Sequence, residues 1–302
     1  MSERIIETHD LTVYYGKYRG IKKVNLDVER GEAFGFLGPN GAGKTTTQRV
    51  LLDVIRPTAG RASIFGMDSR TQGVELRKRV GYLPGELALY KDMRAEEFFK
   101  MYEYLRGASG AKGYWRDLAK QLDLDVSRKI RNFSRGNKQK VGIVAAFMSK
   151  PDLLILDEPT SGLDPLVQQT VMDLVREVKA DGRTVFFSSH ILSEVQAVCD
   201  RVGIIREGEL IATQRVEELI AAHLKRLTLS FADLPPADAF NLEGVTEIAR
   251  KEQRITLEVR ANLPQVLERA ARHSIQDIET QTMSLEEIFL AFYGRGNGGK
   301  HA

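Results

Sequence analysis

The segment Gly38–Thr45, GPNGAGKT, constrains the fold more than any other part of the chain. It follows an apolar run at 33–37 and has the form GxxxxGK plus Ser or Thr, which is typical of loops that wrap around phosphates. Glycines let successive backbone N–H groups point at phosphate oxygens, and the N-terminus of the next helix adds partial positive charge. Lys44 can reach the outer phosphates, and the Thr45 hydroxyl can ligate Mg²⁺. A strand, this loop and a helix together predict a nucleotide-binding α/β fold.

An apolar strand that ends in two acids offers the chemistry that this loop needs. Residues 153–157 read LLILD, and Glu158 follows Asp157 directly. Unpaired charge beside a buried strand is costly, so the acids need partners. If this strand lies beside the phosphate-loop strand, Asp157 can hold the Mg²⁺ shell. Because side chains alternate along a strand, Glu158 can point elsewhere, orient a water on the terminal phosphate and accept its proton. The alternative is that Glu158 caps the following turn.

Strands and helices alternate through the first two thirds of the chain. We expect a helix from the phosphate loop to Ile55, with Val50, Leu51, Val54 and Ile55 on one face. Residues 94–149 have helical periodicity, and Ser134 can cap the helix that enters KVGIVAAFM. The elements expected after them are a strand at 153–157, a helix at 165–180, a strand at 184–189, a helix at 191–200, and a hairpin at 202–212 that turns at Glu207 and Gly208. This pattern predicts a central, largely parallel sheet with a helical insertion.

The pattern changes near residue 220, where short strands and one helix indicate a small α+β unit. A chain of 302 residues fits one large domain and a smaller one. We therefore expect an ATPase domain at 1–220 with a helical subdomain at about 88–150, an accessory α+β domain at 221–295, and a disordered tail at 296–302. The tail is rich in glycine and polar residues, which cannot offset their ordering entropy.

Composition narrows the class of protein. Hydrophobic residues make up 42% and charged residues 28%, as in folded soluble proteins, and the net charge of +3 neither requires nor excludes an anionic partner. The one cysteine, Cys199, cannot form an intrachain disulfide and fits a small buried apolar position in a reducing compartment. The longest apolar helical stretch is far below the roughly 20 residues that span a bilayer. We expect a soluble protein, for which any membrane role must come through a partner.

Several ordered motifs in residues 4–220 resemble the nucleotide-binding subunits of ABC (ATP-binding cassette) transporters. GPNGAGKT is similar to the family's Walker A, LLILDE to Walker B with its catalytic glutamate, and FSRGN to the signature sequence. SGLD is similar to the D-loop, which ends at Asp164. His190 stands where the family has its switch histidine, and Tyr15 where an aromatic residue stacks on adenine.

The resemblance implies a P-loop NTPase of the ABC ATPase type and assigns roles residue by residue. The catalytic residues would be Glu158 and His190, and the metal ligands Thr45 and Asp157. The implied nucleotide contacts are Tyr15, Gly38, Pro39, Asn40, Gly41, Ala42, Gly43, Lys44, Thr45 and Thr46. The implied contacts to a partner subunit's ATP are Ser134, Arg135, Gly136 and Asn137.

Three further stretches narrow the resemblance to ATPase subunits of ABC-2-type exporters: PTSGLDP, SSHILSEVQAVCDRV and SLEEIFLAFYG. In that group the permease is a separate chain, and drugs, antibiotics, lipids or ions are exported. The resemblance implies two such subunits, identical or different, facing head to tail on the cytoplasmic face of the membrane, each ATP lying between one phosphate loop and the other signature helix. The residues agree on one point, because Ser134 opens a helix whose amides form an anion site.

Purely structural roles are an alternative for the residues outside the main motifs. A lone histidine is usually structural, but strand context and the other motifs favour a γ-phosphate contact for His190. Tyr15 has Tyr14 and Tyr18 nearby and can be a packing residue, as can Trp115. One basic run is most simply a solvated face, with an approach to an anionic membrane or to the partner's phosphates as the alternative. Its members are Arg128, Lys129, Arg131, Arg135, Lys138 and Lys140.

Two departures from the family pattern affect the site. Arg135 replaces a glycine of the signature, and Asn137 replaces a glutamine, while Ser134 remains. The larger departure is Gly85, which stands where the family has a glutamine that touches Mg²⁺ or the attacking water. Glu86 follows it, and we expect this carboxylate to reach the metal instead. The alternative is that this sensor is absent.

Two rival functions remain at this stage. DNA-repair ATPases of the same fold carry long coiled-coil insertions, whereas the short segment between Lys44 and Ser134 has no heptads. A regulatory ATP-binding module that barely hydrolyses is compatible with Gly85, but intact Glu158 and His190 weigh against it. The sequence gives no reason to expect a nucleic-acid partner, and it does not identify the transported substrate.

Overall fold

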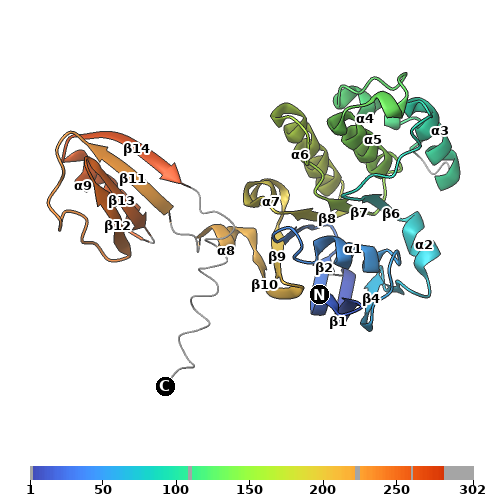
Figure 1. Cartoon of the computed structure of the whole chain (residues 1–302), viewed down its shortest axis with the longest axis horizontal. Coiled ribbons are helices and arrows are strands. Elements are labelled where there is room, and N and C mark those ends of the chain that lie inside the picture. The colour runs from blue at the N-terminus through green and yellow to red at the C-terminus, as the bar shows by residue number, and fades with distance from the viewer. Residues whose placement is uncertain (1–2, 108–110, 222–224, 260, 282–302) are drawn as a thin grey trace. The chain divides into compact units, whose positions relative to one another are not determined.

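The computed structural model describes residues 3–107, 111–221, 225–259 and 261–281 (Figure 1). The chain divides into two compact units, Met1–Val216 and Glu217–Ala302. Each unit has a hydrophobic core of its own. Within the described ranges, no helix is both long enough and apolar enough to cross a bilayer.

The first unit is built on a six-stranded sheet of order β10-β9-β3-β8-β7-β6. Its strands are β3 (Ala33–Leu37), β6 (Val80–Leu83), β7 (Leu153–Asp157), β8 (Thr184–Ser189), β9 (Arg201–Arg206) and β10 (Glu209–Arg215). All neighbours are parallel except β10, which forms a hairpin with β9 through Glu207 and Gly208 as predicted. The largely parallel α/β fold is therefore confirmed. Parallel strands bring their carboxyl ends to one edge, where ligands of such folds bind.

Helices pack on both faces of this sheet, as the continuous apolar strands β3, β7 and β8 require. The α-helices of the unit are α1 (Lys44–Leu51), α2 (Gly73–Lys78), α3 (Ala95–Arg106), α4 (Trp115–Gln121), α5 (Arg135–Phe147), α6 (Pro165–Ala180) and α7 (Leu192–Val198). Helix α8 (Val216–Ala221) begins at Val216, the last residue of the first unit. Figure 1 shows α3, α4 and α5 gathered together beyond β6 and β7, in place of the coiled-coil insertion of the DNA-repair rival.

The expected extension of the first helix to Ile55 is wrong. Helix α1 ends at Leu51, because Asp53 adopts a left-handed backbone with φ of 54°. The N–H groups of Val54 and Ile55 both turn back to the carbonyl of Arg49, which closes the helix end. Val54 is then 60% exposed and does not share the buried face.

An antiparallel sheet of order β2-β1-β4-β5 completes the first unit and was not predicted. Its strands are β1 (Arg4–Tyr15), β2 (Tyr18–Glu29), β4 (Ala59–Ile64) and β5 (Met67–Asp68). The register between β1 and β2 shifts repeatedly, so buried positions do not alternate regularly along β1. These bulges hide the period of two on which a strand prediction depends.

The helical insertion holds several of the residues singled out in the sequence. The Ser134 hydroxyl caps α5 by accepting from the N–H of Asn137 at 3.1 Å, as predicted. Trp115 is buried with its ring 5.6 Å from that of Phe99, which is the packing role. Lys140 departs from the solvated face expected of the basic run, since it is buried and donates to the Asp123 carbonyl. A short 3₁₀ helix, Ile130–Asn132, precedes α5.

Cys199 is buried at the end of α7, and burial raises the pKa of its thiol far above the ordinary value. The Cys199 sulfur packs close to Gly35 of β3, since a Cβ built on this glycine would lie 3.3 Å from it. It therefore serves as a small apolar packing residue, as the sequence predicted.

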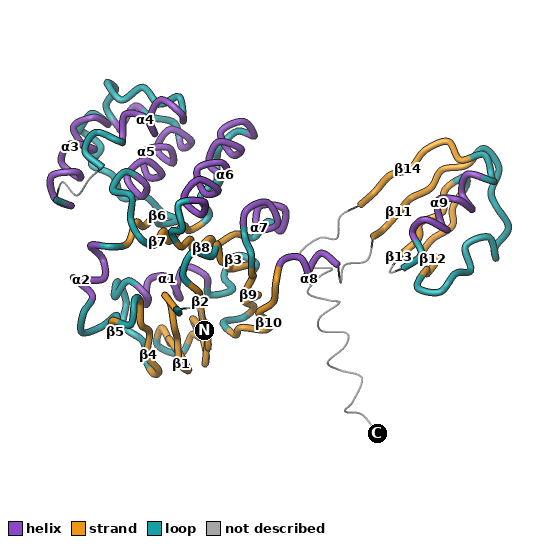
Figure 2. The backbone as a smooth tube through the Cα atoms, turned by 180° about the vertical axis from the view of Figure 1, so that it is seen from behind, coloured by secondary structure: helices purple, strands orange, loops and turns teal. Residues whose placement is uncertain are grey.

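In the described part of the second unit, a four-stranded antiparallel sheet of order β12-β13-β11-β14 packs with helix α9 (Figure 2). Its elements are β11 (Lys225–Phe231), β12 (Val245–Lys251), β13 (Arg254–Val259), α9 (Leu263–Ala271) and β14 (Ile275–Gln281). This order is that of a split βαβ fold in which the segment 232–244 replaces the first helix. Phe240 from that segment packs against Phe231 in the core. SLEEIFLAFYG and the tail at 296–302 lie outside the described residues.

Candidate nucleotide-binding site

A cavity of about 270 Å³ opens at the carboxyl edge of the central sheet. It is lined by Tyr15, Arg19, Gly20, Asn40, Gly41, Gly43, Lys44, Thr45, Thr46 and Glu158. The loop after β3 supplies most of this lining, and the β1–β2 hairpin supplies one side. The structure thus brings the phosphate loop, Tyr15 and Glu158 together at the edge where parallel sheets bind ligands.

The phosphate loop needs its glycines for two physical reasons. Gly41 and Gly43 have φ of 79° and 111°, a region that L side chains disfavour. A Cβ on Gly43 would also lie 2.6 Å from Ile21 of β2, and one on Gly38 would lie 2.3 Å from the Ile205 carbonyl of β9. The loop is therefore held tightly between two strands, with its backbone open toward the cavity.

Lys44 is buried at the first position of α1, with its side chain only 5% exposed. Its ammonium donates to the carbonyls of Gly38 and Pro39 at 2.7 and 3.2 Å. It also lies 3.3 Å from Oε1 of Glu158. A buried ammonium requires such partners, and here they place its charge beside the cavity where phosphate oxygens would lie.

Asp157 is the centre of an oxygen-rich cluster beneath the loop. Its carboxylate accepts from the Thr45 hydroxyl at Oδ2 and from the Ser188 hydroxyl at Oδ1, each at 2.6 Å. Asp157 is only 1% exposed, so these donors replace water. A hydroxyl and a carboxylate are hard oxygen ligands, and this donor set fits Mg²⁺. Ser188 lies in the stretch SSHILSEVQAVCDRV, but sequence reasoning gave it no role of its own.

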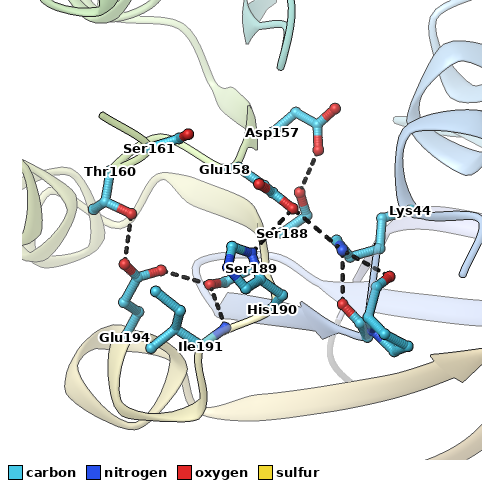
Figure 3. A network of polar contacts seen from close by, with 12 residues as sticks. Lys44, Asp157, Glu158, Thr160, Ser161, Ser188, Ser189, His190, Ile191 and Glu194 are labelled. Carbon is cyan, nitrogen blue, oxygen red and sulfur yellow. Dashed lines mark hydrogen bonds and ion pairs between the residues drawn. The ribbon is translucent and has the colours of Figure 1, made fainter. Parts of the chain in front are cut away.

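Glu158 points away from Asp157 and into the cavity, as Figure 3 shows. Its Oε1 lies between two groups, the ammonium of Lys44 at 3.3 Å and Nδ1 of His190 at 3.2 Å. A neutral imidazole with its proton on Nδ1 can donate to this carboxylate. The Glu158 N–H is anchored to the Ser188 carbonyl at 3.1 Å. The lysine, the glutamate and the histidine thus meet at one point from three separate strand ends.

Gln139 of α5 also positions the backbone at Glu158, and sequence reasoning did not identify it. It is buried, and its amide donates to the carbonyls of Glu158 and Pro159 at 3.4 and 3.0 Å. A polar residue on the buried side of an apolar helix is the signal that could have found it. Gln139 links the signature helix to the backbone of Glu158.

The signature residues lie outside the cavity around Lys44 of their own chain. The Arg135 guanidinium donates to the Ser161 hydroxyl at 3.2 Å. The aliphatic part of the Arg135 side chain packs so close to Gly162 that a Cβ on this glycine would touch it. A Cβ on Gly136 would lie 3.0 Å from the Gly162 carbonyl. Arg135 and Gly136 therefore pack against the D-loop of the same chain. Asp164 caps α6 by accepting from two backbone N–H groups, each at 3.1 Å.

Tyr15 stands at the rim of the cavity, 47% exposed, with its hydroxyl 3.4 Å from that of Thr46. A half-exposed ring at a cavity rim is available for stacking. Arg19 lines the same side and is held by Glu207 at 3.8 Å and Glu209 at 3.2 Å. Sequence reasoning did not single out Arg19.

Gly85 lies directly against Asp157, since a Cβ built on it would be 3.0 Å from Oδ2. The backbone therefore brings this position to the oxygen cluster. Glu86 is exposed and makes no hydrogen bond or ion pair with any residue in the described ranges. Its role as a metal ligand stays a prediction. Across those ranges there is no group of three or more His, Cys, Asp or Glu placed to hold a metal.

Comparisons with known proteins agree with this geometry. The ABC transporter family model matches residues 21–161. The chain is 37% identical over 236 residues to the bacitracin transport ATP-binding protein BcrA of Bacillus licheniformis, covering 78% of this chain and 76% of that protein. It is 31% identical over 313 residues to the linearmycin resistance ATP-binding protein LnrL of Bacillus subtilis, covering 96% and 99%.

Solved structures give the same picture. The structure of an ATP-binding subunit of an ABC transporter superposes with a TM-score of 0.66 at 33% identity, covering 71% of this chain and 91% of that one. A dimeric ATP-binding cassette bound to ADP and Pi superposes with a TM-score of 0.64 at 22% identity, covering 70% and 99%, and supports the fold alone.

Proposed function

This chain belongs to the family of ABC transporter ATP-binding proteins, and from that premise we propose that it drives export of an antibiotic through a permease on a separate chain. Its enzymatic activity is ATP hydrolysis. BcrA is named for bacitracin transport and LnrL for linearmycin resistance, and the similarity to LnrL extends over nearly the whole of both chains. These names support the antibiotic class of cargo.

The observation that carries the enzymatic part is that Glu158, which lines the cavity together with Lys44, contacts both Lys44 and His190. Lys44 and the loop amides bind the phosphates of ATP. Glu158 orients a water and takes its proton as the water oxygen bonds to the γ-phosphorus. The bond from that phosphorus to the β–γ bridging oxygen breaks, and ADP carries the electron pair away. His190 holds the γ-phosphate and the Glu158 carboxylate in mutual alignment.

The proposed metal site consists of Thr45, Asp157 and Glu86. Bound Mg²⁺ supplies positive charge that stabilises the β- and γ-phosphate oxygens. Thr45 and Asp157 already lie together, and Ser188 fixes the second carboxylate oxygen of Asp157. Gly85 abuts Asp157 without a side chain of its own, so the neighbouring Glu86 is the nearest acid that the loop can turn toward the metal.

Replacing Glu86 tests this assignment. Glu86→Ala is expected to lower ATPase activity severalfold and to raise the Mg²⁺ concentration for half-maximal rate, because one carboxylate ligand is lost. Steady-state ATPase rates across a Mg²⁺ titration measure both effects. Glu75→Ala, which removes an exposed acid of α2, is the matched control. An unchanged rate and Mg²⁺ dependence in Glu86→Ala would eliminate Glu86 as a ligand.

The second proposal is that two subunits share each ATP. Arg135 and Gly136 of the signature pack on their own D-loop, no signature residue is part of the cavity lining around Lys44, and Ser134 is exposed at the start of α5. The amides of that helix start form an anion site suited to another chain's nucleotide.

Mixing two inactive variants tests site sharing. Ser134→Arg is expected to block hydrolysis while the monomer keeps its ATP affinity, because arginine obstructs the partner's site only. A heterodimer with Lys44→Ala subunits then contains one intact site, so the mixture recovers ATPase activity that neither variant has alone. Ser127→Arg, an exposed serine in the same subdomain, controls for added charge. No recovery on mixing, or loss of ATP affinity in Ser134→Arg alone, would place the signature in its own chain's site.

The transport proposal is tested in the cell that carries the gene. We propose that the chain sits peripherally on the cytoplasmic face of the membrane, bound to a polytopic permease. The tagged chain should co-purify from membranes with that permease. Deletion should lower resistance to bacitracin, linearmycin or a related compound, and only the wild-type gene, not Glu158→Gln, should restore it. A chain recovered without any membrane partner, or unchanged resistance across the panel, would contradict this proposal.

A further inference from the structure

A buried carboxylate outside the nucleotide cavity joins two parts of the site. Glu194 of α7 is 9% exposed, and each of its oxygens accepts one short hydrogen bond (Figure 3). The Thr160 hydroxyl donates to Oε1 at 2.5 Å, and the Ser189 hydroxyl donates to Oε2 at 2.5 Å. Both donors are almost fully buried. None of the three residues lines the cavity around Lys44.

The two donors belong to different segments, Thr160 to the turn after β7 and Ser189 to the end of β8, and each is within two residues of a proposed catalytic side chain. Thr160 follows Glu158 by two residues, within a turn closed by the Ser161 N–H on the Glu158 carbonyl at 3.1 Å. Ser189 directly precedes His190. The Ser189 hydroxyl also accepts from the Ile191 N–H at 2.9 Å, so its contacts span the histidine. The Ser189 carbonyl accepts from the Gly38 N–H at 3.2 Å, which ties the same residue to the phosphate loop.

The chemistry of Glu194 suits a bridge between the loops. Within the described ranges no cation is paired with its carboxylate, and its charge is satisfied by hydroxyl donors. Hydrogen bonds to an ionised acceptor are roughly twice as strong as neutral ones. An ionised carboxylate only accepts, so both hydroxyl protons are committed to it. Glutamine has the same shape, but its NH₂ group only donates, so one hydroxyl would have to rotate and accept from it, and both bonds would lose the charge of the carboxylate.

We propose that Glu194 is a positioning residue that fixes Glu158 and His190 relative to each other by tying the segment after β7 to the loop after β8. This inference rests on the proposed roles of those two residues. The contact that it protects is the 3.2 Å approach of His190 Nδ1 to Glu158 Oε1. Glu194 does not contact Lys44, and the bonds from Lys44 to the Gly38 and Pro39 carbonyls are made within the phosphate loop, so we expect a larger effect on turnover than on ATP binding.

The test is a set of variants of the full chain, with kcat and KM for ATP as the readouts. Glu194→Gln is expected to lower kcat by roughly 10- to 100-fold with KM unchanged, the scale of loss that a small misplacement of catalytic groups produces. Thr160→Val, which removes one hydroxyl without changing shape, should lower kcat in the same direction. Glu32→Gln removes a similarly buried carboxylate at the opposite end of β3 and controls for destabilisation.

A double variant separates positioning from a general structural effect. If Glu194 acts through the Glu158–His190 contact, Glu194→Gln should cost little further turnover once His190→Ala has removed that contact. Multiplicative losses in the double variant, or a wild-type kcat in Glu194→Gln, would overturn the inference. If Glu194→Gln does not fold, the same double variant is made with Thr160→Val. Wild-type turnover in both Glu158→Gln and His190→Ala would instead refute the proposed function.

Discussion

Glu158→Gln is expected to bind ATP at least as tightly as the wild-type chain and to hydrolyse it roughly 10²–10⁴-fold more slowly, the contribution typical of a positioned general base. An amide cannot take the proton of the attacking water. In the structure, Oε1 of Glu158 also occupies one side of the Lys44 ammonium at 3.3 Å. Removing that negative charge removes a competitor of the phosphate for Lys44, so affinity should not fall.

Two measurements check this expectation on the same preparation. Nucleotide titration gives the Kd for ATP, and single-turnover hydrolysis gives the chemical rate. With the reaction blocked and ATP retained, Glu158→Gln should also shift to a dimer in size-exclusion chromatography with Mg-ATP. Glu177→Gln, an exposed glutamate on α6, is the matched control.

The possible outcomes are distinct. Turnover at the wild-type rate in Glu158→Gln would refute the general-base assignment. A large loss of ATP affinity would instead mean that Glu158 acts in binding, and the turn-capping alternative would gain support from a fall in thermal stability alone. The structure already shows the Glu158 side chain directed at Lys44 and His190 rather than at a helix end.

Local features explain what could be predicted from the sequence. Helix α6 was expected at 165–180 and spans Pro165–Ala180, because Asp164 caps it, Pro165 fits the first turn and Gly182 follows its end. The apolar strands β3, β7 and β8 were equally clear. Each of these signals lies within a few consecutive residues and needs no knowledge of tertiary contacts.

The unpredicted parts of the site depend on contacts between distant segments. Sequence reasoning did not single out Ser188, Gln139 or Glu194, and their importance appears only when β8, α5 and α7 meet around Asp157 and Glu158. Arg135 illustrates the same limit. The sequence showed it as a departure from glycine, and only the fold reveals that its guanidinium donates to Ser161 of the D-loop.

Lys44→Ala is expected to weaken ATP binding by about 10- to 100-fold and to abolish measurable turnover. A hydrogen bond to a charged group contributes about 1.5–3 kcal/mol, and each 1.4 kcal/mol corresponds to about tenfold in affinity. Lys44 is buried between the loop carbonyls and Glu158, so no other cation of the described cavity lining is placed to replace it at that point. Arg19 lies on the Tyr15 side and is engaged by Glu207 and Glu209.

Lys44→Ala also removes contacts that the protein makes in the absence of nucleotide. The carbonyls of Gly38 and Pro39 lose their shared donor, and of the two contacts described for the Glu158 carboxylate only the one with His190 remains. Lys44→Arg retains the charge, but its planar guanidinium does not fit a pocket built for a compact ammonium, and it should be nearly as impaired. Lys78→Ala, an exposed lysine of α2, is the matched control for both variants. Titration of each with ATP decides the matter, because wild-type affinity in Lys44→Ala would mean that the loop amides alone hold the phosphates and that Lys44 serves only turnover.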